Sequence, residues 1–265
     1  MTKEDCYERY MYNLKILGSI SPYCKNDMNC PGYMIYNDKN KILLDCGFGV
    51  SRLLKFPEVL CDLTIILSHC HKDHYADLFA IKYAALCYKK LGLLKSDINI
   101  YIPAVSEDDE CYLDYTLMKH ENESYFQIHE YNEDSNLTID DLEISFFETY
   151  HTTKNYSVKI TNNGKSLVYS GDMGYAKTDQ YIEFLKNVTW FLCECTFLEH
   201  EGENNKYHMH TGEIVKLVNS SHVKHLILTH LWPEHDKNKY LAEVKKHFEN
   251  TVVARENEIF YDIYS

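Results

Sequence analysis

Short apolar runs separated by polar turn residues recur along the whole chain of 265 residues. Most of these runs are rich in β-branched or aromatic residues and short enough to be strands. In chain order they are "LKILGSI", "YMIYN", "KILLDCG", "LTIILSH", "NIYIP", "LEISFFETYH", "YSVKI", "SLVYSGD", "WFLCECTF", "HLILTH", "TVVAR" and "EIFYDIYS". The pattern therefore predicts a protein rich in strands.

Helical periodicity occurs between these runs, in "ADLFAIKYAALCYKKLG", "TGEIVKLVNS" and "KYLAEVKKHF". Gly92 follows the lysines of the first segment and is placed as a C-terminal stop. Strands come first in hairpin-like succession and then alternate with helices, and no Pro/Gly/Ser-rich linker divides the chain. We therefore expect one α/β domain over residues 1–265, with two sheets. Residues 104–135 are acidic and weakly patterned, which predicts a solvated excursion.

Composition and charge narrow the possible partners. Lys and Arg total 27 against 40 Asp and Glu, and the net charge of −13 disfavours an extended grip on long nucleic acid. The start "MTKEDCYERYMYN" is too polar for a secretory signal, and no run approaches the roughly 18 apolar residues of a membrane span. We expect a soluble, cytoplasmic protein whose ten cysteines are mostly reduced and buried. Cys24 and Cys30 are the one pair of cysteines whose spacing could suit a structural zinc. No further residues are evident that could complete the four ligands of such a site.

The stretch "SHCHKDHYAD", residues 68–77, directly follows the apolar run "LTIIL". Alternate side chains of an extended segment share a face, so His69 and His71 can point the same way. Asp73 and His74 follow where the chain must turn into the next helix, and α/β sheets generally place their sites at such junctions. The stretch therefore predicts a metal site, because an alternative of solvated loop histidines leaves the clustering unexplained.

Three later strand-like runs also end in a residue that can bind a metal. They deliver His151, Asp172 and His230. Taken singly, His151 has an ordinary alternative as a core histidine, Asp172 as a turn residue and His230 as a helix cap. Taken together with the first cluster, they supply nitrogen and oxygen donors at the ends of four strands.

This order of motifs resembles that of the metallo-β-lactamase-fold hydrolases, whose fold is a four-layer αββα sandwich. The resemblance implies that one metal takes His69, His71 and His151, that a second takes Asp73, His74 and His230, and that Asp172 bridges both. It also places Asp45, in "LLDCG", behind the cluster as a supporting residue. Imidazole and carboxylate donors without thiolate suit zinc, and also manganese, iron or nickel. Two such ions share a water and lower its pKa, which makes the chain a hydrolase.

Two further stretches, "CECTF" and "YHMHTGE", resemble motifs of the tRNase Z branch of this fold. Strand alternation puts Cys193 and Cys195 on one face and Glu194 on the other. In this resemblance Glu194 and His208 form a pair beside the scissile phosphate, in which His208 assists the leaving oxygen. The flanking positions depart from the branch, since Cys193 replaces a histidine and His210 stands where a threonine is usual. We expect His210 to be a second phosphate contact or, more simply, a surface histidine.

tRNase Z enzymes carry a flexible arm that grips tRNA, and in the bacterial enzymes it is inserted between the positions that match His151 and Asp172. This sequence has no room for such an arm. Only 20 residues separate His151 from Asp172, and this stretch predicts a simple hairpin with a turn at "NNG". The chain thus resembles the small armless members of the branch, including YhfI-like bacterial proteins and the phage anti-Pycsar cyclic nucleotide phosphodiesterases. Their likeness implies a homodimer and hydrolysis of small phosphodiesters, most simply 3′,5′-cyclic mononucleotides, by a hydroxide that bridges the two metals, with Asp73 among the catalytic residues. An aromatic side chain such as Tyr23 or Tyr75 is expected to stack on the base, with packing as the alternative.

Three other functions remain open at this stage. An RNase Z-like endo- or exoribonuclease would use every residue named so far. A lactonase or thioesterase would need the metals but not the pair of Glu194 and His208. A metal-stabilised binding protein is the non-enzymatic alternative, although no ligand position is degenerate.

Overall fold

The computed structural model describes residues 11–122, 126–176, 178–202 and 205–265. Within them the chain forms two seven-stranded sheets, ordered β14-β1-β2-β3-β4-β5-β6 and β13-β12-β11-β10-β9-β8-β7. The strands of the first sheet are β1 (Asn13–Gly18), β2 (Gly32–Tyr36), β3 (Lys41–Leu44), β4 (Leu63–Ile66), β5 (Ile98–Pro103), β6 (Phe126–Tyr131) and β14 (Ile259–Phe260). Those of the second are β7 (Asn136–Ile139), β8 (Leu142–Glu148), β9 (Tyr156–Asn162), β10 (Lys165–Tyr169), β11 (Trp190–Glu194), β12 (His225–Thr229) and β13 (Thr251–Val253).

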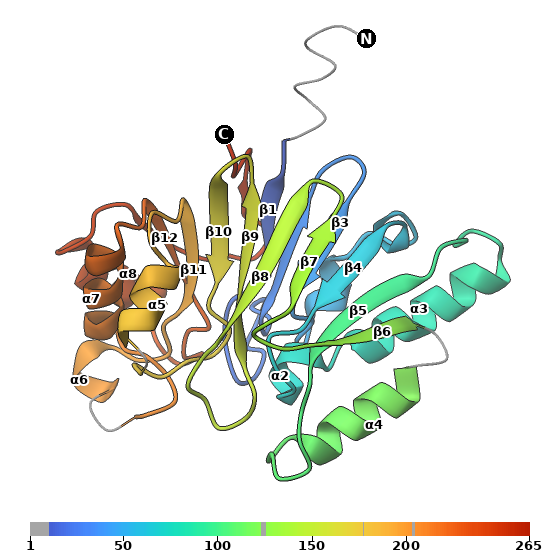
Figure 1. Ribbon diagram of the computed structural model, residues 1–265, viewed down its shortest axis with the longest axis horizontal. Helices are drawn as coiled ribbons and strands as arrows, with labels where there is room; N and C mark the ends of the chain where they lie inside the picture. The colour runs from blue at the N-terminus through green and yellow to red at the C-terminus, as the bar shows by residue number, and fades with distance from the viewer. Residues whose placement is uncertain (1–10, 123–125, 177, 203–204) are drawn as a thin grey trace, which may run out of the picture.

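Helices cover the outer face of each sheet (Figure 1). The first sheet carries the 3₁₀ helices η2 (Val50–Leu53) and η3 (Glu58–Leu60) and the helices α2 (Lys72–Tyr75), α3 (Leu78–Lys90) and α4 (Tyr112–Asn122). The second carries α5 (Thr178–Phe184), α6 (Glu199–Gly202), α7 (Thr211–Ser221) and α8 (Lys237–Lys245). The result is the predicted αββα layering.

Strand alternation explains why three separate layers of core form: the first under the helices of the first sheet, the second between the two sheets, and the third under the helices of the second sheet. In β3, Ile42 and Leu44 point between the two sheets, whereas Leu43 points outward under the helices. In β12, Ile227 points between the sheets and Leu228 packs beneath the helices of the second sheet. Both faces of these strands are buried, so they form continuous apolar runs instead of alternating with polar residues.

The three predicted helices are confirmed as α3, α7 and α8. The predicted hairpin is confirmed too: β9 and β10 pair antiparallel, with Asn163 and Gly164 at positive φ in the turn. Positive φ at both central residues is the geometry of a type I′ turn. The direct connection leaves no inserted arm between β9 and β10.

The prediction of a solvated excursion over residues 104–135 is wrong for residues 112–122 and 126–131, which form α4 and β6. β6 adds in parallel to β5 at the edge of the sheet, and α4 packs on the first core layer through Tyr115 and Met118. The acidic surface hides this in the sequence, because only a few inward positions of α4 and β6 are apolar.

No helix in the described part of the chain is long and apolar enough to cross a bilayer. Residues 1–10, which the secretory-signal prediction concerns, lie outside the described residues. The predicted homodimer stays a prediction.

Candidate active site

The candidate ligands lie where strands of the two sheets end. His69 and His71 follow β4, and Asp73 and His74 lie in the short helix α2. The remaining donors follow three strands of the second sheet: His151 after β8, Asp172 after β10 and His230 after β12. The carboxyl ends of parallel strands gather at one edge of a sheet, so residues far apart in sequence meet there.

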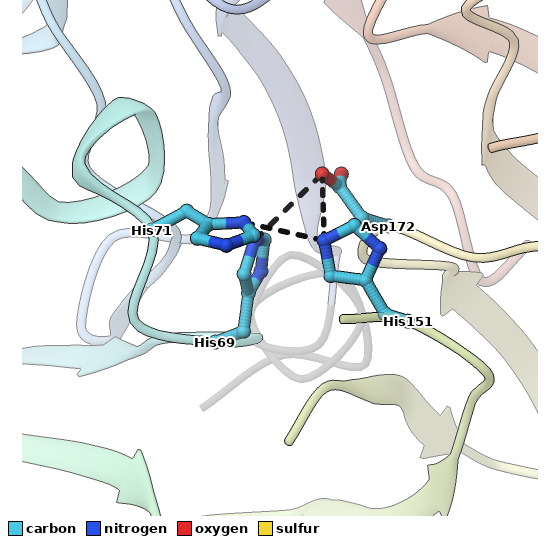
Figure 2. Close-up of side chains that lie close together, drawn as sticks. All are labelled: His69, His71, His151 and Asp172. Atoms are coloured by element: carbon cyan, nitrogen blue, oxygen red, sulfur yellow. Dashed lines mark hydrogen bonds and ion pairs between the residues drawn. The ribbon is translucent and has the colours of Figure 1, made fainter. Parts of the chain in front are cut away.

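Three histidine nitrogens converge in the first cluster, as Figure 2 shows. His71 Nδ1 lies 2.9 Å from His69 Nε2 and 3.2 Å from His151 Nε2. Oδ2 of Asp172 lies 3.7 Å from the Nε2 atoms of both His69 and His151. Two ligands of a tetrahedral zinc are roughly 3.3 Å apart when the Zn–N bonds are about 2.0 Å long, so the spacing suits a metal.

In each of these three rings, the nitrogen that points away from the cluster has a hydrogen-bond acceptor of its own. His71 Nε2 donates to Glu110 at 3.1 Å, and His151 Nδ1 donates to the carbonyl of Tyr207 at 3.1 Å. His69 Nδ1 lies 3.0 Å from the hydroxyl of Ser68. The network therefore assigns the protons to the outer nitrogens and leaves three lone pairs facing one another. Lone pairs at this distance repel, and a bound cation removes that repulsion.

A second cluster lies beside the first and shares Asp172 with it. Oδ1 of Asp172 lies 3.0 Å from His230 Nε2 and 3.4 Å from His74 Nε2, and Asp73 Oδ2 lies 3.7 Å from His74 Nε2. Despite these short distances none of the contacts has hydrogen-bond geometry, and His74 Nε2, His230 Nε2 and Asp172 Oδ1 are buried with no hydrogen-bond partner among the described residues. Buried polar atoms without a partner are rare, so this donor set also fits a metal.

Asp45 supports these ligands from behind. Its buried carboxylate accepts hydrogen bonds from His74 Nδ1 at 2.7 Å, from the Tyr169 hydroxyl at 2.6 Å and from the Ser68 hydroxyl at 2.8 Å. Since the Ser68 proton goes to Asp45, the Ser68 oxygen is left to accept from His69. One carboxylate thus orients His74 directly and His69 through a hydroxyl, which is the usual support for metal-binding histidines.

Glu194 supports two histidines, His208 and His230, in the same way as Asp45 supports His74 and His69. Its side chain has no exposed surface, and its Oε1 lies 3.2 Å from His208 Nδ1. Its Oε2 accepts from the Thr196 hydroxyl at 3.0 Å, and the same hydroxyl lies 3.0 Å from His230 Nδ1. Glu194 therefore holds His208 directly and His230 through Thr196. The sequence prediction for this strand is confirmed, because Cys193 and Cys195 face the third core layer.

Two neighbouring histidines differ in charge in this environment, because His151 is neutral and His208 is protonated. Burial lowers the pKa of His151 to about 4, which suits a neutral metal ligand. Burial also disfavours the charged form of His208, but the adjacent Glu194 carboxylate outweighs it and raises the pKa of His208 to about 9. Although His208 lies near Asp172 and His230 as well, a protonated imidazole has no lone pair for a metal. When the environment pushes the pKa values of neighbouring groups apart, the group with the raised value is the one that carries a proton, and here that group is His208.

An open cavity of about 490 Å³ lies over these groups. It is lined by Ser21, Pro22, His71, Lys72, Asp73, Asp114, Asp172, Thr196, Phe197, Asn205, His208, His230 and Trp232. Its lysine, Lys72, is paired with Asp114 at 2.8 Å. The cavity is large enough for a small molecule and offers little positive charge.

The structure does not bring three predicted contacts to this cavity. Tyr75 is 5% exposed in the first core layer, and the hydroxyl of exposed Tyr23 donates to Glu234. His210 caps α7: its ring accepts from the Gly212 amide, and Glu213 completes a capping box. None of the three is among the residues that line the cavity.

Cys24 and Cys30 are both free thiols. Cys24 Sγ donates to the carbonyl of Phe48, and burial raises the pKa of Cys30 above its ordinary value. Neither belongs to a cluster that could hold a metal among the residues that the structure describes.

Sequence reasoning missed Ser68, Glu110 and Thr196, which hold ligands in place. Ser68 directly precedes His69, and Thr196 lies two residues after Glu194. A hydroxyl this close to a metal-binding histidine or a buried glutamate is a usable signal. Glu110 lies 39 residues from His71, and no spacing connects them.

Comparisons with known proteins agree with this geometry. The profile of the "Beta-lactamase superfamily domain" matches residues 40–231. The chain is 29% identical over 202 residues to the "Probable metallo-hydrolase YhfI" of Bacillus subtilis, covering 76% of this chain and 79% of the relative. It is 20% identical over 304 residues to a "Ribonuclease Z" of Archaeoglobus fulgidus, covering 93% and 96%.

Solved structures show the same fold. The crystal structure of YhfI from Bacillus subtilis matches with a TM-score of 0.84 at 24% identity, covering 95% of this chain and 99% of that one. A diphosphatase from the PhnP family matches with a TM-score of 0.69 at 14% identity, covering 94% and 97%. The predicted αββα fold is therefore confirmed, and the chain belongs to the metallo-β-lactamase superfamily of metal-dependent hydrolases.

Proposed function

We propose that this protein is a phosphodiesterase that binds two divalent metal ions, with zinc as the first choice, and hydrolyses small phosphodiesters such as 3′,5′-cyclic mononucleotides. The observation that carries the proposal is the pairing of His208 with buried Glu194 beside the two donor clusters. Lactone or thioester hydrolysis has no use for this pair.

Two clusters would hold the metals. His69, His71 and His151 would form one set and Asp73, His74 and His230 the other, with one oxygen of Asp172 directed at each. When bound, such a pair of ions supplies an activated water and neutralises the charge of a phosphate group. Imidazole donors suit zinc and carboxylate donors suit manganese, and the histidine-rich sets make zinc the first choice.

The chain's own groups would then position and protonate the substrate. Nδ1 of His208 donates to Glu194, so its Nε2–H remains to donate to the leaving oxygen. An alkoxide is a poor leaving group, and its departure is accelerated when a positioned acid supplies a proton. Glu194 keeps His208 protonated and in one orientation.

The charge of the cavity favours small substrates. Bound ions would neutralise the ligand carboxylates of Asp73 and Asp172, and the remaining acidic residue of the lining, Asp114, is already paired with Lys72. Among the described lining residues no unpaired lysine or arginine is left to hold the further phosphates of a long nucleic acid, and the direct β9–β10 hairpin offers no arm to hold tRNA. A diester with a single negative charge fits this site best.

A substrate panel tests the proposal. Protein loaded with zinc or manganese is incubated with 3′,5′-cyclic mononucleotides, bis-p-nitrophenyl phosphate, precursor tRNA and short oligoribonucleotides. We expect turnover of the cyclic nucleotides and the nitrophenyl diester. Rapid RNA cleavage with inert cyclic nucleotides would overturn the proposal in favour of a ribonuclease, which the resemblance to Ribonuclease Z keeps as the second candidate.

A further inference from the structure

Two aromatic side chains, Phe197 and Trp232, form an apolar wall in a cavity whose other lining residues, apart from Pro22, are polar or charged. The rings of Phe197 and Trp232 lie 6.4 Å apart between centroids, with 26° between their planes. Both side chains are half-buried and line the cavity. The wall lies beside His208, the proposed acid, because the centroid of the Phe197 ring is 6.5 Å from that of the His208 ring.

The strand register explains this placement. β11 and β12 pair in parallel, with Glu194 opposite Thr229. Phe197 and Trp232 each lie three residues beyond this pair, so both leave the sheet at the same level and at the same edge as the donor clusters. The sequence thus places the two rings side by side, Phe197 directly after Thr196 and Trp232 two residues after His230.

Backbone hydrogen bonds hold both ends of the wall. The amide of Phe197 donates to the carbonyl of Met209, and its carbonyl accepts from Thr211. Leu231, which precedes Trp232, exchanges backbone hydrogen bonds with Ser19 and Ser21. A wall anchored in this way loses little conformational entropy when a ligand stacks on it, so stacking there is favourable.

We propose that Phe197 and Trp232 form a subsite for a planar heterocycle, such as a nucleobase, on the leaving-oxygen side of the substrate. This inference rests on the proposed function and specifies its substrate class. The rest of the cavity lining is largely polar or charged, including Asp73, Asp114 and Lys72. One flat ring therefore matches the apolar surface, whereas a long acyl chain would extend over carboxylates.

The position beside His208 fixes which part of the substrate is recognised. His208 would protonate the leaving oxygen, and the group attached to that oxygen then lies toward Phe197. In a 3′,5′-cyclic nucleotide this group is the nucleoside itself. Stacking of a base on an aromatic side chain tolerates every base because each has a π-face, so the wall selects for a base without choosing among them.

The fluorescence of Trp232 reports on this subsite without any turnover. The chain has two tryptophans, and Trp190 packs on His225, 4.4 Å between ring centroids. In the Trp190→Phe variant, excited at 295 nm, we expect saturable quenching by adenosine and cytidine and none by ribose. Equal responses to nucleosides and ribose would overturn the subsite.

Kinetics give a second readout. We expect Trp232→Leu to raise the KM for cyclic nucleotides about tenfold or more, since base stacking is worth about 1–3 kcal/mol. Hydrolysis of 1,3-propanediol cyclic phosphate, which has the same cyclic diester and no base, should be unchanged. Tyr261→Leu, which removes a ring that is 73% exposed and does not line the cavity, is the matched control. An unchanged KM ratio of base-bearing to base-free substrate in Trp232→Leu would overturn the subsite.

The experiments distinguish failure of the proposed phosphodiesterase function from failure of the proposed base subsite. If wild-type protein hydrolyses neither cyclic phosphate but cleaves RNA, the proposed function fails, and the quenching of Trp232 by nucleosides still decides on the subsite. If both cyclic phosphates are hydrolysed and Trp232 does not respond to nucleosides, the function stands and the subsite is wrong.

Discussion

Nδ1 of His208 lies 3.2 Å from Oε1 of Glu194, and that carboxylate has no exposed surface. Oε1 also lies 3.0 Å from the Met173 amide and 3.3 Å from the Met209 amide, so Glu194 is held in a single orientation. His208, which lines the cavity, is therefore positioned by a carboxylate that is shielded from the solvent in the cavity.

The first prediction concerns pH. The Glu194 carboxylate raises the pKa of His208 to about 9, so the acid form is present below that pH and is lost as the pH rises through it. We expect kcat for a cyclic nucleotide to fall as the pH rises through about 9, which gives the pH profile an alkaline limb. In Glu194→Gln the carboxylate charge is gone, the pKa of His208 falls, and the limb should move to lower pH. Identical limbs in the two proteins, both folded by circular dichroism, would contradict the role of Glu194.

The second prediction concerns Thr196, whose hydroxyl connects Glu194 to His230. Thr196→Val keeps the shape but removes both hydrogen bonds. Loss of such a supporting group typically costs about 10- to 100-fold in metal affinity, and we expect that loss by isothermal titration with zinc. Thr196→Ser keeps the hydroxyl and is the matched control. Wild-type affinity in Thr196→Val would show that His230 needs no support.

The third prediction concerns Asp172, which directs one carboxylate oxygen at each cluster. We expect the wild-type chain to bind two ions by elemental analysis, and Asp172→Asn to bind fewer. Asp108→Asn, which changes an exposed carboxylate, should bind as the wild type does. Equal metal content in all three proteins would contradict the shared role of Asp172.

Metal binding should also stabilise the fold. A ligand that binds only the native state adds about 2.7 kcal/mol when its concentration is 100 times its Kd. We expect the melting temperature to rise with added zinc in the wild type and to rise less in Asp172→Asn, as measured by scanning calorimetry. A melting temperature that zinc leaves unchanged in the wild type would mean that the clusters hold no ion in the native state.

Much of this site is readable from the sequence because its ligands are local features of strand ends. "LTIIL" predicts a buried strand, and the histidines that follow it must emerge at the sheet edge. The same reasoning applies to His151, Asp172 and His230, and strand alternation alone separates Glu194 from its neighbouring cysteines.

The residues that sequence reasoning missed or misplaced depend on contacts through space. Glu110 reaches His71 only because the segment before α4 folds back over the site, and that segment resembles solvated loop in its composition. Tyr75 lies next to the metal motif, but helical periodicity turns its ring into the core. His210 does lie three residues before Glu213, the spacing of a capping box, but histidine is not a usual cap residue.

The most direct test of the account compares two leaving groups in His208→Ala. A cyclic nucleotide expels an alkoxide that needs a proton, whereas bis-p-nitrophenyl phosphate expels a phenolate that does not. We predict that kcat falls about 10²- to 10⁴-fold for the cyclic nucleotide and far less for the nitrophenyl diester, and that neither rate changes in His200→Ala, a substitution on the exposed face of α6. Equal losses on both substrates, or none on either, would contradict the assignment of His208 as the acid.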